Sequence, residues 1–272
     1  MNLTKEVKKK KQFSELPDSV IERALENSGN DVKGARALLR KYFGVFLVNK
    51  VLKAKSFDEG ILKNHISSKD RDYEGLYKRV FGVVGRFSFE NPSLPPSASL
   101  KNLVKGKPFK KIVGCVVDLG CGVNGFSYKF LPEGIVYVGV EGVGQLVKLT
   151  NNYLKDRGFE GAHVFHRDLF DLNFVFDILR KLRENKLRVV FLFQIIDALE
   201  FFEKDFSKKF LLGISEESEF VVLSFALRSL SGKKGFEVKR KWLLSFIEKY
   251  FDVLSDFQVK DERFLILKNK NN

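Results

Sequence analysis

The stretch at residues 116–125 (VVDLGCGVNG) constrains the fold of this chain more than any other. Its apolar, β-branched start favours a buried parallel strand, which Asp118 ends. Gly120 and Gly122 let the backbone approach a ligand closely, and residues 126–131 can open a helix whose first amides face the same pocket. The pattern predicts a strand, a ligand-binding loop and a helix in succession.

A second apolar run, at 135–140 (IVYVGV), ends at Glu141. This is about the offset at which a doubly wound sheet presents an acid to a ribose diol. The dinucleotide fingerprint would require G-x-G-x-x-G, whereas here Asp118 stands just before the glycines. The hexamer VDLGCG resembles the first motif of class I S-adenosylmethionine (SAM) methyltransferases, in which the acid and the loop backbone hold the amino-acid end of the cofactor. The resemblance implies SAM as the cofactor.

Apolar runs alternate with helical segments along the rest of the chain, in the βαβ manner. They place strands at 113–117, 135–140, 162–166, 188–193 and 220–225, and a late strand at 263–268. The fold class is therefore α/β with a mostly parallel sheet, and the resemblance to class I SAM methyltransferases implies a Rossmann-like sheet with an antiparallel late strand. Ligands of such sheets bind beyond the carboxyl ends of the strands. Five side chains should converge there: Asp118, Glu141, Asp168, Gln194 and Arg228. Asp168 suits an adenine amino group, although an ordinary helix cap would also explain it.

Three helix starts are expected before residue 90. Ser19 and Glu22 form a capping-box pattern after Pro17, a second helix should follow Asn30 and Asp31, and Ser67 with Asp70 precedes a third apolar stripe. That stripe comprises Tyr73, Leu76, Tyr77, Val80 and Phe81. Residues 88–110, rich in proline, serine and lysine, indicate a linker. We expect an all-helical domain with its linker at 1–106 and the α/β domain at 107–272.

The positive charge is concentrated in the N-terminal part of the chain. The net charge is +14 in total, and residues 1–110 carry 23 Lys and Arg against 12 Asp and Glu. A basic surface of this kind suits a polyanion such as RNA, because phosphate neutralisation releases counterions. A lysine-rich solvated surface is the plainer alternative.

No apolar run reaches the roughly 20 residues of a membrane span, and the basic stretch at 8–11 lacks a following apolar signal region. We expect a soluble, cytoplasmic monomer without membrane contact. Cys115 and Cys121 show no metal-ligand spacing and read as small buried residues. The three histidines share no ligand spacing either, so no metal site is expected.

The segment at 224–232 (SFALRSLSG), followed by a basic glycine stretch, resembles the aminoglycoside-resistance family of ribosomal RNA methyltransferases, which carry Ser-Phe-x-x-Arg/Lys-Ser-Leu-Gly/Ser-Gly. Residues 65–71 (HISSKDR) are similar to the family's His-x-Ser-Thr-x-Glu-Arg, and 16–20 (LPDSV) matches its helical region. The resemblance runs in the same order over nearly the whole chain. It implies N7-methylation of a guanosine in small-subunit ribosomal RNA, with the helical domain docking on the small ribosomal subunit.

The same resemblance implies roles for individual residues. At the cofactor we expect Arg71 to bind the carboxylate, and Asp118, Gly120 and Gly122 to bind the methionine portion. Glu141 is expected at the ribose and Asp168 at the adenine. Gln194 is also expected to contact the cofactor. The target nucleotide is expected beside Arg228 and Ser229, and its RNA beside Lys69, Lys233 and Lys234. Gln194 stands where the family carries a lysine, and Glu141 where it carries an aspartate.

The chemistry of N7 agrees with the absence of a conspicuous general base. Methylation of an exocyclic amine usually uses a polar-Pro-Pro-aromatic motif after the fourth strand, and C5 of a pyrimidine needs a cysteine nucleophile. Neither follows Phe193. Guanine N7 has an in-plane lone pair, so positioning suffices. Two alternatives stay open: an inactive SAM-binding ribosome-assembly or RNA-binding factor, and a methyltransferase that acts on another RNA.

Overall fold

The computed structural model describes residues 2–43, 60–65, 68–89, 114–183, 187–227 and 240–272 of the 272-residue chain. The helices are α1 (Leu3–Lys8), η1 (Lys11–Phe13), α2 (Asp18–Glu26), α3 (Val32–Tyr42), α5 (Gly60–Asn64), α6 (Tyr73–Phe89), η2 (Asn124–Phe130), α8 (Gly144–Asp156), α9 (Leu172–Lys181), α10 (Ile196–Phe202), α11 (Phe206–Glu216) and α12 (Lys241–Tyr250). The strands are β1 (Gly114–Leu119), β2 (Ile135–Glu141), β3 (Ala162–His166), β4 (Arg188–Phe193), β5 (Phe220–Ala226), β6 (Phe251–Val259) and β7 (Glu262–Asn269). Within these ranges, none of the helices has the length and apolar character that crossing a membrane requires.

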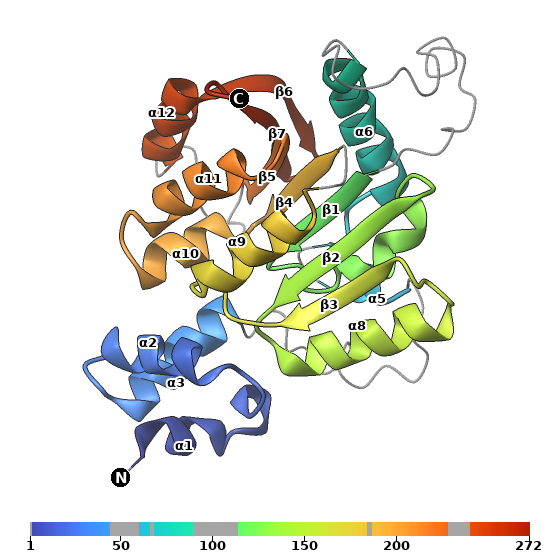
Figure 1. Cartoon of the computed structure of the whole chain (residues 1–272). Helices are drawn as coiled ribbons and strands as arrows, with labels where there is room; N and C mark the ends of the chain where they lie inside the picture. Colours follow the sequence, from blue (N-terminus) through green and yellow to red (C-terminus); the bar gives the residue numbers. More distant parts are fainter. Residues whose placement is uncertain (1, 44–59, 66–67, 90–113, 184–186, 228–239) are drawn as a thin grey trace.

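All seven strands form one sheet in the order β3-β2-β1-β4-β5-β7-β6 (Figure 1). The first five run parallel, whereas β7 pairs antiparallel with β5 and β6 pairs antiparallel with β7. The mostly parallel sheet and the antiparallel late strand are confirmed. β6 was not expected from the sequence, because most of its side chains are at least partly exposed and its buried positions do not follow a clear alternation.

Alternate residues of the central strands face two separate apolar layers. Val116 and Phe191 point to the layer that contains α6 and α8, whereas Val117 and Val190 point to the layer of α9, α10, α11 and α12. Tyr77 of α6 stacks on Phe191, with 5.8 Å between the ring centroids. Helices therefore cover both faces, which explains why the strands are nearly continuous apolar runs.

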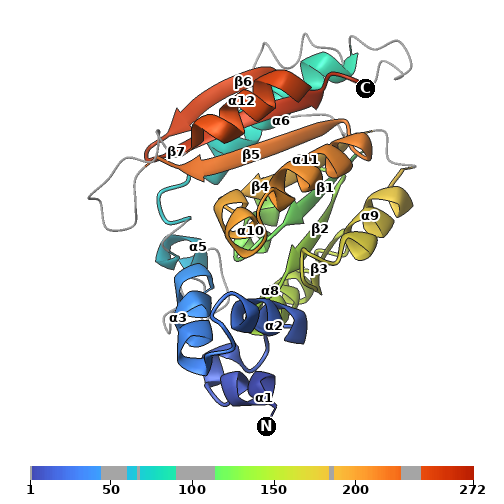
Figure 2. The same cartoon turned by 90° about the vertical axis from the view of Figure 1, so that its left-hand side faces the viewer.

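The N-terminal helices divide into two groups. α1, α2 and α3 lie together beyond the carboxyl ends of β2 and β3 (Figures 1 and 2). The Gly144 amide of α8 donates to the Glu15 carbonyl at 3.2 Å, and Lys148 pairs with Glu15 at 2.9 Å. α6 instead packs on the sheet, where Val80, Phe81 and Val84 are fully buried. The linker expected at 88–110 lies almost wholly outside the described residues, so the boundary at 106 stays a prediction.

The helix starts agree with the sequence only in part. The second helix follows Asp31 as expected, and Asp31 caps it by accepting from the amides of Lys33 and Gly34. The capping box proposed at Ser19 is wrong: α2 begins at Asp18, directly after Pro17, without a side-chain cap. The third helix has the expected apolar face, but it begins at Tyr73.

The side chain that caps α6 is Asp72, which accepts from the Gly75 amide at 3.1 Å. Asp70 forms an exposed ion pair with Lys260 instead. Ser67 lies outside the described residues. The helix therefore starts at a cap two residues after the expected capping box. Several side chains in this stretch are able to cap, so the local sequence alone did not select Asp72.

Candidate cofactor site

The glycine loop after β1 has the backbone geometry that its sequence predicts. Gly120 and Gly122 adopt φ of +76° and +53°, in the left-handed region that favours glycine. A Cβ on Gly120 would lie 3.0 Å from Ile195, so the loop also approaches the segment after β4 closely. The strand runs to Leu119, two residues beyond its expected end at 117, which places Asp118 inside β1, paired with Gly139. The loop is continued by η2, a 3₁₀ helix where a helix was expected.

Glu141 holds this loop from the end of β2. Its two carboxylate oxygens accept from the amides of Gly122 and Val143, each at 2.8 Å. The side chain is buried, and burial raises the pKa of Glu141 above its ordinary value against the opposing effect of these amide bonds. Each oxygen keeps a second acceptor position that a ligand hydroxyl can use.

Asp118 belongs to a buried polar network under the loop. Its Oδ2 accepts from Tyr137 Oη at 2.9 Å and from Asn124 Nδ2 at 3.1 Å. Its Oδ1 is buried and has no hydrogen-bond partner among the described residues. Burial raises the pKa of Asp118 to about 7, against the lowering effect of these two hydrogen bonds. A buried carboxylate oxygen without a partner is the feature expected where a cationic ligand group binds.

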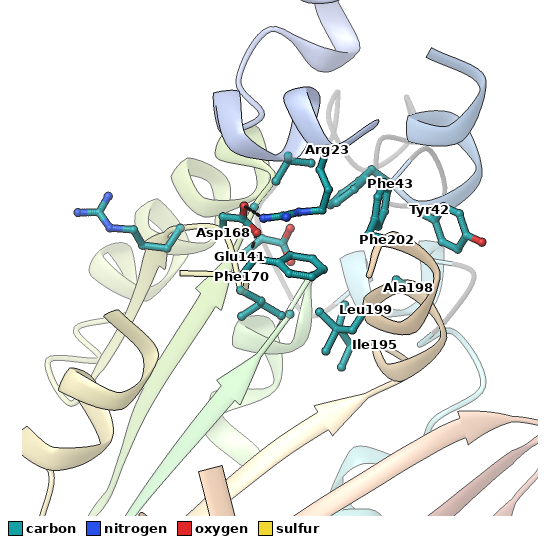
Figure 3. Close-up of a pocket in the computed structure, with 15 residues that line it drawn as sticks. Arg23, Tyr42, Phe43, Glu141, Asp168, Phe170, Ile195, Ala198, Leu199 and Phe202 are labelled. Carbon is teal, nitrogen blue, oxygen red and sulfur yellow. Dashed lines mark hydrogen bonds and ion pairs between the residues drawn. The ribbon is translucent and has the colours of Figure 1, made fainter. Parts of the chain in front are cut away.

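A cavity of about 630 Å³, counting the space open to solvent, lies at the carboxyl ends of the parallel strands (Figure 3). Gly120, Glu141 and Asp168 line it, together with Ile195 after β4. The three residues expected at the methionine, ribose and adenine ends of the cofactor therefore share one cavity.

Asp168 follows β3 and is already partnered from α2. Its Oδ2 accepts from Ser19 Oγ at 2.7 Å, and its Oδ1 accepts from the Phe170 amide at 3.1 Å. The guanidinium of Arg23 approaches the same carboxylate at 3.7 Å. The amide contact is a local turn and not the helix cap considered as the plainer role, because α9 is capped by Asp171, which accepts from the Phe174 amide at 3.2 Å. The contacts from α2 were not foreseen, because no local pattern connects residues 149 positions apart.

Arg71 lies outside this cavity, in the same buried network as Asp118. Its guanidinium donates to both carboxylate oxygens of Glu262, each at 2.7 Å, and to Asn124 Oδ1 at 3.0 Å. Burial acts to lower the pKa of Arg71, but the carboxylate of Glu262 outweighs it, so the pKa is raised. Ser224 also hydrogen-bonds Glu262. Asn124 connects Arg71 to Asp118, whereas contact of Arg71 with a cofactor carboxylate stays a prediction.

The remaining expected residues separate into two groups. Gln194 has φ of +57°, unusual for a residue other than glycine, and its amide donates to the Ser224 carbonyl at 3.1 Å. It does not line the cavity, and Lys69 is exposed. Arg228, Ser229, Lys233 and Lys234 lie outside the described residues.

Neither cysteine nor histidine chemistry is suggested at this site. Cys115 and Cys121 are buried free thiols, as expected. His65 is buried, and burial lowers its pKa to about 4, so it is neutral. His163 and His166 are exposed on the edge strand β3. In the part of the chain that the structure describes, no group of three metal-ligating side chains is assembled.

Solved structures share this fold over almost the whole chain. 16S rRNA methyltransferase RmtF in complex with S-adenosyl-L-homocysteine (SAH) has a TM-score of 0.71, covers 98% of this chain and 97% of its own, and is 17% identical. 16S rRNA methylase RmtB has a TM-score of 0.67 at 15% identity, covering 99% and 98%. An rRNA methylase from Escherichia coli has 0.64 at 15% identity, covering 99% of each chain. The chain has the class I methyltransferase fold of these rRNA methylases.

The sequence comparison with curated proteins matches only a short part of this chain. A curated protein, 23S rRNA (uracil(1939)-C(5))-methyltransferase RlmD of Shewanella sediminis (strain HAW-EB3), is 41% identical over 54 residues. These residues make up 20% of this chain and 12% of that protein, so the match spans about an eighth of the relative's length. No protein-family model matches the chain.

Proposed function

We propose that this protein is a SAM-dependent RNA methyltransferase that modifies N7 of a guanosine in small-subunit ribosomal RNA. The observation that carries the proposal is the cavity in which Gly120, Glu141 and Asp168 meet at the carboxyl ends of three neighbouring strands. Ligands of doubly wound sheets bind at this edge. The fold shared with 16S rRNA methylases across nearly the full length supports the substrate class.

The residues of the site fit SAM in chemical terms. The glycine loop lines the cavity at Gly120, Glu141 offers carboxylate oxygens to ribose hydroxyls, and the unpartnered Oδ1 of Asp118 suits a cationic amino group. SAM supplies an electrophilic methyl group on a sulfonium. In our proposal Arg71, Glu141 and Asp168 bind its carboxylate, ribose and adenine respectively, and Arg228 and Ser229 hold the target base.

Transfer to N7 requires little of the protein beyond positioning. The N7 lone pair forms the new bond to the methyl carbon while the carbon–sulfur bond breaks, leaving a neutral thioether and a cationic base. No proton leaves N7, so the site needs no general base and acts by aligning the two reactants.

The other rRNA chemistry suggested by the comparisons, C5 methylation of uracil, fits the chain less well. That reaction needs a cysteine nucleophile, and the sequence contains only Cys115 and Cys121. Both thiols are buried, and neither lines the cavity. Burial raises the pKa of Cys115 to about 12 and that of Cys121 well above its ordinary value, which opposes thiolate formation.

A second candidate is a SAM-binding factor in ribosome assembly that has no transferase activity. The same cavity and the basic N-terminal part would serve it, since binding alone needs no aligned target base. The two candidates differ at residues 228–235, because a factor that only binds RNA has no need for Arg228 beside the cofactor.

The test incubates the purified protein and labelled SAM with small ribosomal subunits, bare rRNA and tRNA. Borohydride and aniline treatment then reports N7-methylguanosine by strand cleavage. We expect label in small subunits and cleavage at one position. Glu141→Ala should lose both SAH binding and labelling, whereas Arg228→Ala should bind SAH normally and fail to label. Normal SAH binding by the wild type without label in any RNA would favour the inactive factor, and label without cleavage would exclude N7.

A further inference from the structure

One wall of the cavity comes from the N-terminal helices. Val20 and Arg23 of α2 and Tyr42 of α3, with Phe43 directly after it, line the same cavity as Glu141 and Asp168, and Arg23 reaches toward Asp168 (Figure 3). Val20 and Arg23 lie about one helical turn apart in α2. Ser19, next to Val20, donates its hydrogen bond to Asp168 from the same side of the helix. The site is therefore completed by side chains from outside the sheet.

Arg23 is held in this wall by contacts that leave hydrogen-bonding capacity. Its guanidinium carbon lies 3.9 Å from the ring centroid of Phe170, so the charged group rests on that aromatic side chain. Its terminal nitrogens lie 3.7 Å from Asp168 and 3.8 Å from Glu203, beyond hydrogen-bonding distance. Its Nε is buried and has no hydrogen-bond partner among the residues that the structure describes.

A buried N–H donor without an acceptor is unfavourable in the ligand-free protein. The same donor becomes favourable when a ligand brings an acceptor into the cavity. Asp168 accepts hydrogen bonds, whereas Arg23 only donates them, so together they present both kinds of partner to one planar group. A purine carries an exocyclic amine beside ring-nitrogen acceptors and matches this pair.

We propose that Arg23 is an adenosine-binding residue, contributed to the cofactor site by the N-terminal helices. The proposal deepens the proposed function and depends on it. Arg23 belongs to the adenosine end because it contacts Asp168 and Phe170, two residues that follow β3. In the sheet, β3 is two strands away from β1, which carries Asp118. Neighbouring strands are about 4.8 Å apart, so β3 and β1 are separated by roughly 10 Å.

The experiment compares two ligands by calorimetry on the full-length protein. SAH carries both the adenosine and the amino-acid end, whereas 5′-methylthioadenosine lacks the amino-acid end. We expect Arg23→Met to weaken both ligands by the same factor, about ten- to a hundredfold, as for the loss of one charge-assisted hydrogen bond. Lys33→Met removes an exposed charge from the same group of helices and should change neither affinity.

Arg23→Lys guards against a purely structural effect. Lysine keeps the positive charge between Asp168 and Glu203 and the aliphatic stem, but it has neither Nε nor a planar guanidinium. Binding of 5′-methylthioadenosine should be weakened in this variant as well. Asp118→Asn should weaken SAH while leaving 5′-methylthioadenosine unchanged, which locates the two ends of the ligand.

The outcomes separate this inference from the proposed function. A wild-type protein that binds neither ligand contradicts the proposed function itself. A wild-type protein that binds both, with Arg23→Met and Arg23→Lys equal to it, overturns only the role of Arg23. Loss confined to SAH overturns it too, because the contact would then be with the amino-acid end.

Discussion

Asp118 makes cofactor affinity depend on pH, and the direction follows from its burial. The pKa of this carboxyl is raised to about 7, so it is mostly protonated at pH 6 and mostly ionised at pH 8. The ordinary value is 3.8, which the unfolded chain approaches. Because the folded protein holds the proton more tightly, the unfolding free energy of the ligand-free protein should fall as pH rises from about 4 to 7 and level off above it.

Affinity for SAH should change in the opposite direction. If the ammonium group of the ligand pairs with ionised Asp118, binding at pH 6 must first remove a proton that is already absent at pH 8. For a pKa of about 7 this lowers the affinity at pH 6 about tenfold relative to pH 8. Calorimetry in buffers of different ionisation enthalpy should detect the release of about one proton per ligand at pH 6 and almost none at pH 8.

Two variants test the assignment to this carboxyl. Asp118→Asn cannot ionise, so its weaker SAH affinity should be nearly independent of pH over this range. Tyr137→Phe removes the 2.9 Å hydrogen bond to Oδ2 that lowers the pKa, so the midpoint of the affinity profile should move to higher pH. Equal wild-type affinities at pH 6 and pH 8, with no proton release, would refute the reasoning.

Three further substitutions test the glycine loop, the buried ion pair and the basic helices, the first two with matched controls. Gly120→Ala should weaken SAH binding strongly, since its Cβ meets Ile195 at 3.0 Å, whereas Gly158→Ala, with a similar φ and open space, should cost only about 1–2 kcal/mol of stability and leave affinity unchanged. Glu262→Gln leaves the buried guanidinium of Arg71 without its counter-charge, so it should lower the unfolding free energy, measured by denaturant titration, by about 3–5 kcal/mol. Asp256→Asn, the control, breaks an exposed ion pair and should lower it by about 1 kcal/mol or less. Arg40→Glu, on the exposed side of α3, should weaken small-subunit binding in filter assays and flatten its salt dependence without altering SAH affinity.

The packing of α6 decides how the role of the basic region can be tested. A chain starting near residue 107 would lack Val80, Phe81 and Val84, which are buried in the layer against the sheet. Weaker RNA binding by such a shortened chain could therefore come either from lost RNA contacts or from a disrupted hydrophobic core. Charge reversal on exposed positions of α3 avoids this problem.

Local patterns in the sequence determined the elements whose signal lies within a few residues. Alternation of apolar β-branched runs and helical segments placed five parallel strands, and the glycines after β1 predicted a turn that needs positive φ. Glu141 at the end of β2 and Asp31 at the start of α3 were also located in this way. These features depend on side-chain period and backbone sterics, which neighbouring residues set.

The tertiary structure decided every feature that depends on residues far apart in the chain. Ser19 resembled a helix cap, yet its hydroxyl donates to Asp168, 149 positions away. Arg71 is paired with Glu262, 191 positions away, and Arg23 enters the cavity from a helix that precedes the sheet by about 90 residues. A polar side chain hydrogen-bonds to whichever partner the packed chain brings within reach. Burial then stabilises that pairing, because leaving a buried polar group unpaired costs free energy. Local periodicity therefore predicts the scaffold, whereas the partners of its polar side chains become known only once the layers are packed together.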